Sequence, residues 1–238
     1  MNEHTPKSNP SVNVPFPHDS AHKHVNGEAR FGDDIPEPQG LLHAYARPAE
    51  RTHARIISMD LAPVRAFPGV KAVVAAADLH ATSNDIGTAF PGDLVFADGE
   101  VQYHGQPLFA VAADSRATAR RAAMQAKIEY EDLPAILTID EALAAQAEVR
   151  PTKEWVRGEP ERALAHATHR LSGRTFTGEQ EQFYLEGQVA TAIPQEDGDM
   201  LVHCSTQGPS GDQRKIAKVM GVADHAVTVE NRRMGGGF

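Results

Sequence analysis

The chain has 238 residues, of which 41% are hydrophobic and 23% are charged. At about 150 residues per domain this is one large domain or two modest ones, and the composition excludes wholesale disorder, collagen-like repetition and a fibrous coiled coil. The formal net charge of −9 lacks the positive excess that binding to a nucleic-acid backbone needs. We therefore expect a globular protein without a nucleic-acid partner.

Cys204 is the one cysteine of the sequence, so no internal disulfide can form. An iron–sulfur cluster or a structural zinc site usually takes several thiolates, so such a centre would have to lie on a partner. The first twenty residues contain no apolar run of signal-peptide length, and no later stretch reaches the roughly 18 apolar residues of a membrane span. These features predict a cytoplasmic protein that does not enter a membrane.

The first half of the chain predicts an α+β domain over residues 23–134, preceded by a loose, proline-rich arm over residues 1–22. Asp114 and Ser115 are candidate N-caps for a helix that runs through Lys127 and whose alanines recur at helical spacing, a narrow face suited to packing on a sheet. β-Branched and alternating runs predict strands at 55–59, 70–76, 100–103, 108–112 and 128–133.

The second half begins after a linker over residues 135–156, which carries a short alanine-rich helix. A helix is predicted from Pro160 to about Ala167, and another after a Ser210 to Gln213 capping box, ending at Gly221. Strands are predicted at 174–177, 183–193, 200–206 and 226–230, with a turn at 197–198. Because the sequence stops in a glycine run directly after a strand, we expect an N-terminal fragment whose second domain, 157–238, is truncated.

Three features invite a functional interpretation on residue type alone. The run Gly235–Gly237 lets backbone N–H groups approach a ligand's oxygens closely, although on spacing alone a flexible terminal loop is the commoner explanation. It matches neither a P-loop nor a dinucleotide fingerprint. The acidic residues Glu179, Glu181 and Glu186 allow a general acid–base pair but favour a solvated surface. Cys204 is interpreted as a small buried hydrophobe.

Two phrases carry a family resemblance: Gln-Glu-Gln-Phe-Tyr-Leu-Glu at 180–186 and Arg-Met-Gly-Gly-Gly-Phe at 233–238. In this order they resemble the molybdopterin-binding subunits of the molybdenum hydroxylase family, which includes xanthine dehydrogenases and aldehyde oxidases. The resemblance covers nearly the whole chain after about residue 17. Further landmarks stand at 24–29, 33–36, 105–107, 130–134 and 205–207.

The resemblance implies that residues 23–134 form the α/β hammerhead domain and that residues from 157 begin the molybdenum cofactor domain. Gln180 resembles the glutamine whose amide donates to an oxo group on molybdenum. Gly236, Gly237 and Phe238 resemble the turn whose backbone lies against the metal's oxygen and the pterin, so Gln180 and Phe238 mark the molybdenum environment. No catalytic residue is expected in this chain, because the family's general base would follow Phe238. The family usually has glycine and histidine in place of Glu179 and Gln182.

The resemblance further implies a xanthine dehydrogenase subunit that hydroxylates hypoxanthine or xanthine. Its electrons would pass through iron–sulfur clusters and FAD on a partner subunit to NAD, in a hetero-oligomer, and the fragment alone would be inactive. One alternative is an aldehyde oxidase or another N-heterocycle hydroxylase, distinguished by whether a glutamate stands four residues after Phe238. Another is a non-catalytic docking module.

Overall fold

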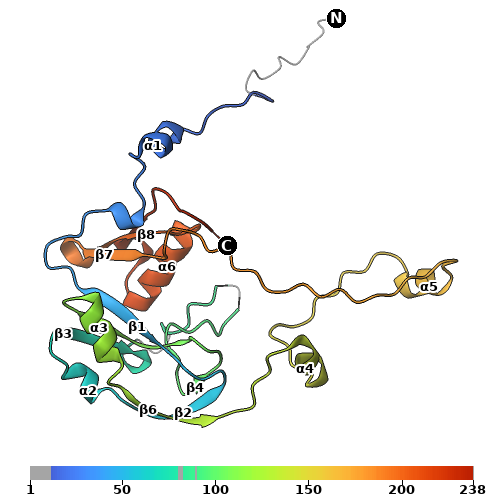
Figure 1. The fold of residues 1–238 in the computed structure, drawn as a ribbon, viewed down its shortest axis with the longest axis horizontal. Helices are drawn as coiled ribbons and strands as arrows, with labels where there is room; N and C mark the ends of the chain where they lie inside the picture. The colour runs from blue at the N-terminus through green and yellow to red at the C-terminus, as the bar shows by residue number, and fades with distance from the viewer. Residues whose placement is uncertain (1–11, 80–82, 89, 238) are drawn as a thin grey trace, which may run out of the picture. The chain divides into compact units, whose positions relative to one another are not determined.

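The computed structural model describes residues 12–79, 83–88 and 90–237, and the chain divides into two units (Figure 1). The central unit comprises Pro38–Phe183 and Lys218–Val222. The flanking unit comprises Met1–Glu37, Tyr184–Ala217 and Ala223–Phe238. Both units combine helices with their own sheets, so the α+β prediction is confirmed. Across the described ranges no helix has the length and apolar character to cross a membrane; α6 (Pro209–Met220) has 12 residues.

The central unit holds two three-stranded antiparallel sheets, in the orders β1-β5-β3 and β4-β2-β6. The five strands predicted in this half are confirmed, although β4 is shorter than predicted. The strand β1 was not predicted, because its sequence is poor in β-branched residues. The strands are β1 (His43–Pro48), β2 (Ala54–Asp60), β3 (Val70–Ala75), β4 (Glu100–Val101), β5 (Pro107–Ala113) and β6 (Lys127–Asp132).

A buried glutamine separates β4 from β5. Gly105 has a φ of 92°, which favours glycine, and the next side chain, Gln106, is 1% exposed. The Oε1 atom of Gln106 accepts a hydrogen bond from the backbone N–H of Gln102 at 2.8 Å, so this buried side-chain oxygen has a partner inside the turn. On the two sides of this turn, β4 pairs with β2 in one sheet and β5 lies between β1 and β3 in the other.

Helix α3 (Arg116–Ala123) packs on β1 and β5. The Ser115 hydroxyl caps it by accepting a hydrogen bond from the Thr118 N–H at 3.1 Å, and Ala122 and Ala123 are fully buried against the sheet. The helix is shorter than predicted, because the chain turns after Ala123 to enter β6. The short elements of this unit are α2 (Ala62–Arg65) and the 3₁₀ turn η2 (Ala76–Asp78).

Residues 135–183 are almost entirely exposed and contain α4 (Ile139–Ala144) and α5 (Pro160–Ala165), the two short helices predicted there. The strand predicted at 174–177 is wrong. A strand needs a neighbour for its backbone hydrogen bonds, and none of the described strands pairs with this segment, where Phe176 is 89% exposed.

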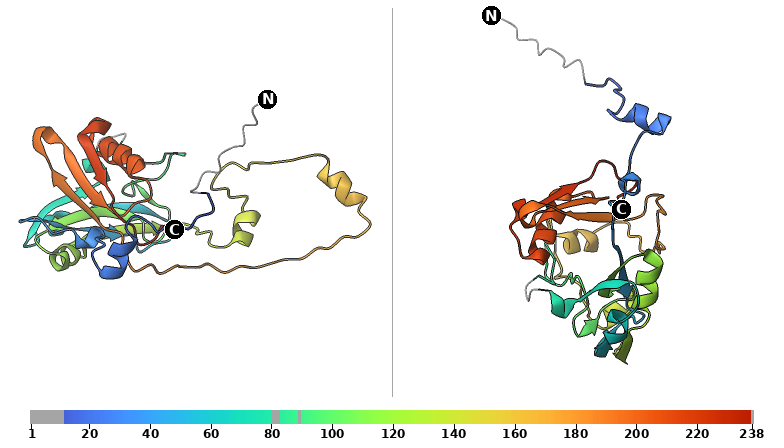
Figure 2. Two further views of the ribbon diagram at one scale, coloured as in Figure 1. Left: turned by 90° about the horizontal axis from the view of Figure 1, so that it is seen from above. Right: turned by 90° about the vertical axis from the view of Figure 1, so that its left-hand side faces the viewer.

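The flanking unit has one sheet, in the order β7-β8-β9, with α6 beside it (Figure 2). Its strands are β7 (Ala190–Pro194), β8 (Met200–Cys204) and β9 (Val227–Glu230). The turn at Asp197 and Gly198, both at positive φ, joins the antiparallel pair β7 and β8, as predicted. The strand predicted at 183–193 begins only at Ala190. The other elements of this unit are α1 (Ala21–Asn26) and the 3₁₀ turns η1 (Gly32–Asp34), η3 (Glu196–Gly198) and η4 (Asp224–Ala226).

Helix α6 confirms the helix predicted before Gly221, but not its capping box. Ser210 lies inside the helix and cannot be its N-cap. The Gln213 side chain instead donates a hydrogen bond to the carbonyl oxygen of Val227 at 2.7 Å, which ties α6 to the first residue of β9. Gly221 has a φ of 70° and ends the helix.

Candidate cofactor site at one edge of the flanking sheet

The topology of the flanking sheet brings three loops to one edge. Strands β8 and β9 are parallel, with His203 opposite Glu230, so their carboxyl ends share an edge. Strand β7 is antiparallel to β8, with Ala190 opposite Cys204, so the amino end of β7 lies at the same edge. Loops at the carboxyl ends of parallel strands are a common place for ligands. The segments 184–189, 205–208 and 231–237 meet at this edge.

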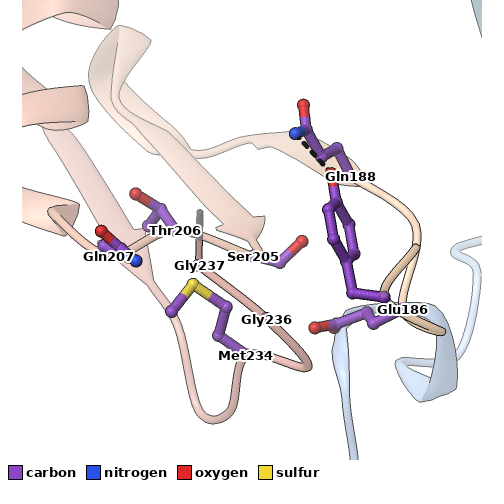
Figure 3. Close-up of a pocket in the computed structure, with 9 residues that line it drawn as sticks. Glu186, Gln188, Ser205, Thr206, Gln207, Met234, Gly236 and Gly237 are labelled. Carbon is purple, nitrogen blue, oxygen red and sulfur yellow. Dashed lines mark hydrogen bonds between the residues drawn. The ribbon is translucent and has the colours of Figure 1, made fainter. Parts of the chain in front are cut away.

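A cavity of about 240 Å³ lies among these three loops (Figure 3). Its lining offers amides, hydroxyls, a thioether, glycine backbone and one carboxylate, and none of the described lining residues is a cation. Hydrogen-bonding groups of this kind, converging on a concave site, are typical of ligand pockets. The lining residues are Tyr184, Glu186, Gln188, Ser205, Thr206, Gln207, Met234, Gly236 and Gly237.

The Glu186 carboxylate joins two other segments of the unit at this cavity. Its Oε1 atom accepts a hydrogen bond from the backbone N–H of Gly32 at 3.2 Å, and its Oε2 atom accepts one from the backbone N–H of Gly235. The prediction that Glu186 is a solvated surface residue is therefore wrong, since the side chain is partly buried and hydrogen-bonded. Its place at the end of the 180–186 phrase is the one sequence signal that distinguishes it from Glu179 and Glu181.

The glycine-rich turn is needed for close approach and not for a left-handed backbone, since neither Gly235 nor Gly237 has a positive φ. A Cβ at Gly235 would lie 2.5 Å from the Cβ of Glu186. A Cβ at Gly237 would overlap the side-chain amide of Gln207 and lie 2.6 Å from its Cδ. Figure 3 shows both side chains around the turn. The backbone at Gly235 and Gly237 therefore lies so close to the side chains of Glu186 and Gln207 that there is no room for a Cβ atom at either glycine.

Hydrogen bonds fix the loop that follows β8. The Thr206 hydroxyl donates to the Asp212 carboxylate and accepts from the backbone N–H of Gly208 at 3.0 Å. The Asn231 amide donates to the carbonyl oxygen of Thr206, which links this loop to the one after β9. In the third loop, Gln188 Nε2 donates to the Tyr184 hydroxyl at 2.8 Å (Figure 3). All three loops are thus restrained by their own side chains.

The remaining predicted site residues lie elsewhere. Gln180 is exposed, belongs to the central unit and does not line the cavity, whereas Gly236 and Gly237 do. Phe238 lies outside the described residues. Burial raises the pKa of the partly buried Cys204 thiol, and the negative charge of Asp212 raises it further, so this cysteine is poorly suited to act as a nucleophile. In the part of the chain that the structure describes, no three His, Cys, Asp or Glu side chains form a metal-binding group.

Two family models match the chain. Residues 26–134 match the aldehyde oxidase and xanthine dehydrogenase a/b hammerhead domain, and residues 143–238 match the molybdopterin cofactor-binding domain. The cavity lies wholly within the second range.

Known proteins agree with these models. The chain is 38% identical over 229 residues to xanthine dehydrogenase of Drosophila subobscura and 41% identical over 232 residues to nicotinate hydroxylase of Emericella nidulans. Each match covers 95% of this chain and 17% of the relative, so the chain spans about a sixth of their length. The solved aldehyde oxidoreductase of Desulfovibrio gigas superposes with a TM-score of 0.78 at 28% identity, over 93% of this chain and 27% of that one. The chain belongs to the aldehyde oxidase and xanthine dehydrogenase family of molybdenum hydroxylases, carrying its α/β hammerhead domain and the start of its molybdopterin cofactor-binding domain.

Proposed function

We propose that this chain is part of the molybdenum-cofactor subunit of a xanthine dehydrogenase, which hydroxylates hypoxanthine and xanthine. The observation that carries the proposal is the cavity between the loop after β8 and the glycine-rich turn, which lies inside the range matched by the cofactor-binding model. The identity with a xanthine dehydrogenase, which extends over both matched domains, supports the substrate class. In this proposal the hammerhead domain occupies residues 23–134 and a linker occupies 135–156.

The chemistry of the cavity lining fits a pterin cofactor. A pterin ring presents both hydrogen-bond donors and acceptors, and the amide of Gln207, the hydroxyls of Ser205 and Thr206 and the backbone of Gly236 and Gly237 offer complementary groups. These residues would hold the cofactor. Because the amide, hydroxyl and backbone groups do not titrate near neutral pH, they would hold it without coupling its redox state to their own protonation.

We assign two further contacts from the family resemblance. The side-chain amide of Gln180 would donate a hydrogen bond to an oxygen of the cofactor, and Phe238 would complete the glycine-rich turn. When bound, the molybdenum cofactor supplies the two-electron redox chemistry that hydroxylation requires. The residues of this chain bind and orient it, and we assign no general base among them.

The electrons would leave through centres on a partner. Cys204 is the single cysteine of the 238 residues, too few for an iron–sulfur cluster. A cluster would therefore lie outside these 238 residues, and from the family resemblance we assign the iron–sulfur clusters and FAD to a partner subunit of a hetero-oligomer, with NAD as the final acceptor.

The test uses the enzyme that contains these residues, purified from a host that makes the molybdenum cofactor. We expect molybdenum in the protein and hypoxanthine-dependent NAD reduction. The variant Gln180→Ala should lower kcat by about 10²-fold, the effect of losing one preorganised hydrogen-bond donor, while molybdenum content is kept. The matched control, Gln182→Ala, changes the same exposed segment and should retain activity. A protein without molybdenum, or equal effects of the two variants, would contradict the proposal. The 238-residue chain alone should not turn over.

A second candidate is an N-heterocycle or aldehyde hydroxylase. The 41% identity with nicotinate hydroxylase and the fold shared with an aldehyde oxidoreductase favour it. The same enzyme preparation distinguishes the two candidates through kcat/KM for hypoxanthine, nicotinate and benzaldehyde. A preference for nicotinate or benzaldehyde over hypoxanthine would establish the second candidate in place of the first.

A further inference from the structure

A second cavity of the flanking unit, of about 400 Å³, is lined mainly by cations. Lys23, Glu28 and Arg30 come from α1 and the residues after it, and Arg232 and Arg233 follow β9. Four cations and one carboxylate give this lining a net charge of +3, in a chain whose net charge is −9. The cavity shares no lining residue with the candidate cofactor cavity.

The four cations of this second cavity outnumber its one carboxylate. None of the four cations forms an ion pair with a described carboxylate. The Arg233 guanidinium donates to the carbonyl oxygen of Arg30 at 3.2 Å and to the Ser20 hydroxyl at 3.0 Å, both neutral acceptors. Its Nε–H is buried and has no hydrogen-bond partner among the described residues. The contacts that orient this guanidinium leave its charge and one donor unsatisfied.

We propose that this second cavity binds a phosphate group, either as inorganic phosphate or as part of a nucleotide. Guanidinium groups match the oxygens of phosphate in charge and in hydrogen-bond geometry. Three arginines surround the cavity, and a phosphate group can offer three terminal oxygens where a carboxylate offers two. The volume falls within the range of small-molecule sites, about 300–1,000 Å³. This proposal does not depend on the proposed hydroxylase activity.

Isothermal titration calorimetry of the 238-residue chain with inorganic phosphate, AMP and a tetraglutamate peptide tests the proposal. The double variant Arg30→Gln/Arg232→Gln removes two of the charges and keeps Arg233, which is anchored in the fold. We expect it to weaken phosphate binding by about tenfold or more, since each charge-assisted hydrogen bond is among the strong ones. The matched control is Arg214→Gln on the exposed side of α6, which should bind as the unchanged chain does.

The three probes have distinct outcomes. Equal affinity for AMP and phosphate indicates that the cavity recognises the phosphate group alone. Tighter binding of AMP indicates that its ligand is a nucleotide. Tighter binding of tetraglutamate than of either phosphate compound overturns the proposal in favour of an acidic protein segment. Absence of saturable phosphate binding, or an equal loss in the Arg214→Gln control, also overturns it.

A second measurement stands even if the double variant fails to fold. In the unchanged chain, the Arg233 Nε–H resonance in a ¹H–¹⁵N correlation spectrum should shift on addition of phosphate, because the anion would bind beside the guanidinium that carries this N–H. An unmoved Arg233 resonance at phosphate concentrations that saturate the calorimetric signal would place the anion elsewhere.

Discussion

Glu186 binds the glycine-rich turn through the backbone N–H of Gly235, a residue 49 positions further along the chain. The other oxygen of the same carboxylate accepts a hydrogen bond from Gly32, 154 positions earlier. One side chain therefore ties the start of η1, the loop before β7 and the turn after β9 to one another. The shape of the candidate cofactor cavity depends on this carboxylate.

The variant Glu186→Gln tests that dependence. A glutamine keeps one acceptor oxygen but turns an NH₂ group toward a backbone N–H, so one of the two hydrogen bonds is lost. A hydrogen bond to a charged group contributes about 1.5–3 kcal/mol, so amide exchange at Gly235 or Gly32 should quicken by roughly 10- to 100-fold. Hydrogen exchange followed by NMR measures it. Glu179→Gln, an exposed control, should leave both amides unchanged, and protection that survives in Glu186→Gln would refute the role.

Two glycine-to-alanine variants should change stability in opposite directions. At Gly235 the added Cβ meets the Glu186 Cβ at 2.5 Å, and overpacking of this kind costs about 1–3 kcal/mol. At Gly211, inside α6, nothing lies within 4 Å of the added Cβ, so alanine should stabilise by about 0.5–1 kcal/mol through helix propensity. Urea unfolding of both variants gives the two signs. Destabilisation by Gly211→Ala, or tolerance of Gly235→Ala, contradicts the packing described here.

Two helix caps should differ in their effect on global stability. Ser115 caps α3, which buries Thr118 and three alanines, whereas Thr138 caps α4, which buries no residue. Ser115→Ala should therefore lower the free energy of unfolding by about 1 kcal/mol, and the Tm by about 2–4 °C. Thr138→Ala should melt α4 locally and leave the Tm unchanged, as differential scanning calorimetry can establish. Equal shifts in the two variants would mean that α4 is part of the cooperative core.

Local signals in the sequence predicted most elements correctly, because each depends on nearby residues. Asp114 and Ser115 predict the start of α3, where the structure selects Ser115. Gly221 predicts the end of α6, and Asp197 with Gly198 the turn between β7 and β8. Strand pairing depends on distant residues and was harder to predict. The strand predicted at 174–177 is wrong, because nothing in the local sequence shows that no described strand pairs with this segment.

The candidate site was also predictable in part: its glycine run could be found from the sequence, but the side chains that contact it could not. The glycine run predicts a close approach of the backbone, and the structure supplies the partners, Glu186 and Gln207, which no spacing rule connects to it. Composition alone favoured a solvated Glu186, because acidic clusters usually face water. Its two hydrogen bonds arise from chain segments that only the tertiary fold brings together.

His53 should make the stability of the central unit depend on pH. Its Nδ1 lies 2.6 Å from the carbonyl oxygen of Pro134 and its Nε2 lies 3.2 Å from Oε1 of Glu100, so both ring nitrogens face acceptors. The hydrogen bond to Pro134 raises the pKa of His53 above its ordinary value of 6.5, and Glu100 raises it further. A raised pKa in the folded state means that the imidazolium stabilises the fold below the unfolded pKa, and that this contribution is lost as pH rises through the folded pKa.

The Tm of the unchanged chain should therefore fall more between about pH 5.5 and pH 8.5 than the Tm of His53→Gln, whose side chain does not titrate. Glu100→Gln removes one acceptor charge but keeps the Pro134 contact, so its His53 pKa should lie between 6.5 and that of the unchanged chain. NMR titration of the His53 ring gives each pKa directly. Because the chain has 12 histidines, the comparison with His53→Gln isolates this one. A His53 pKa at or below 6.5 in the folded chain would remove the basis for the pH dependence.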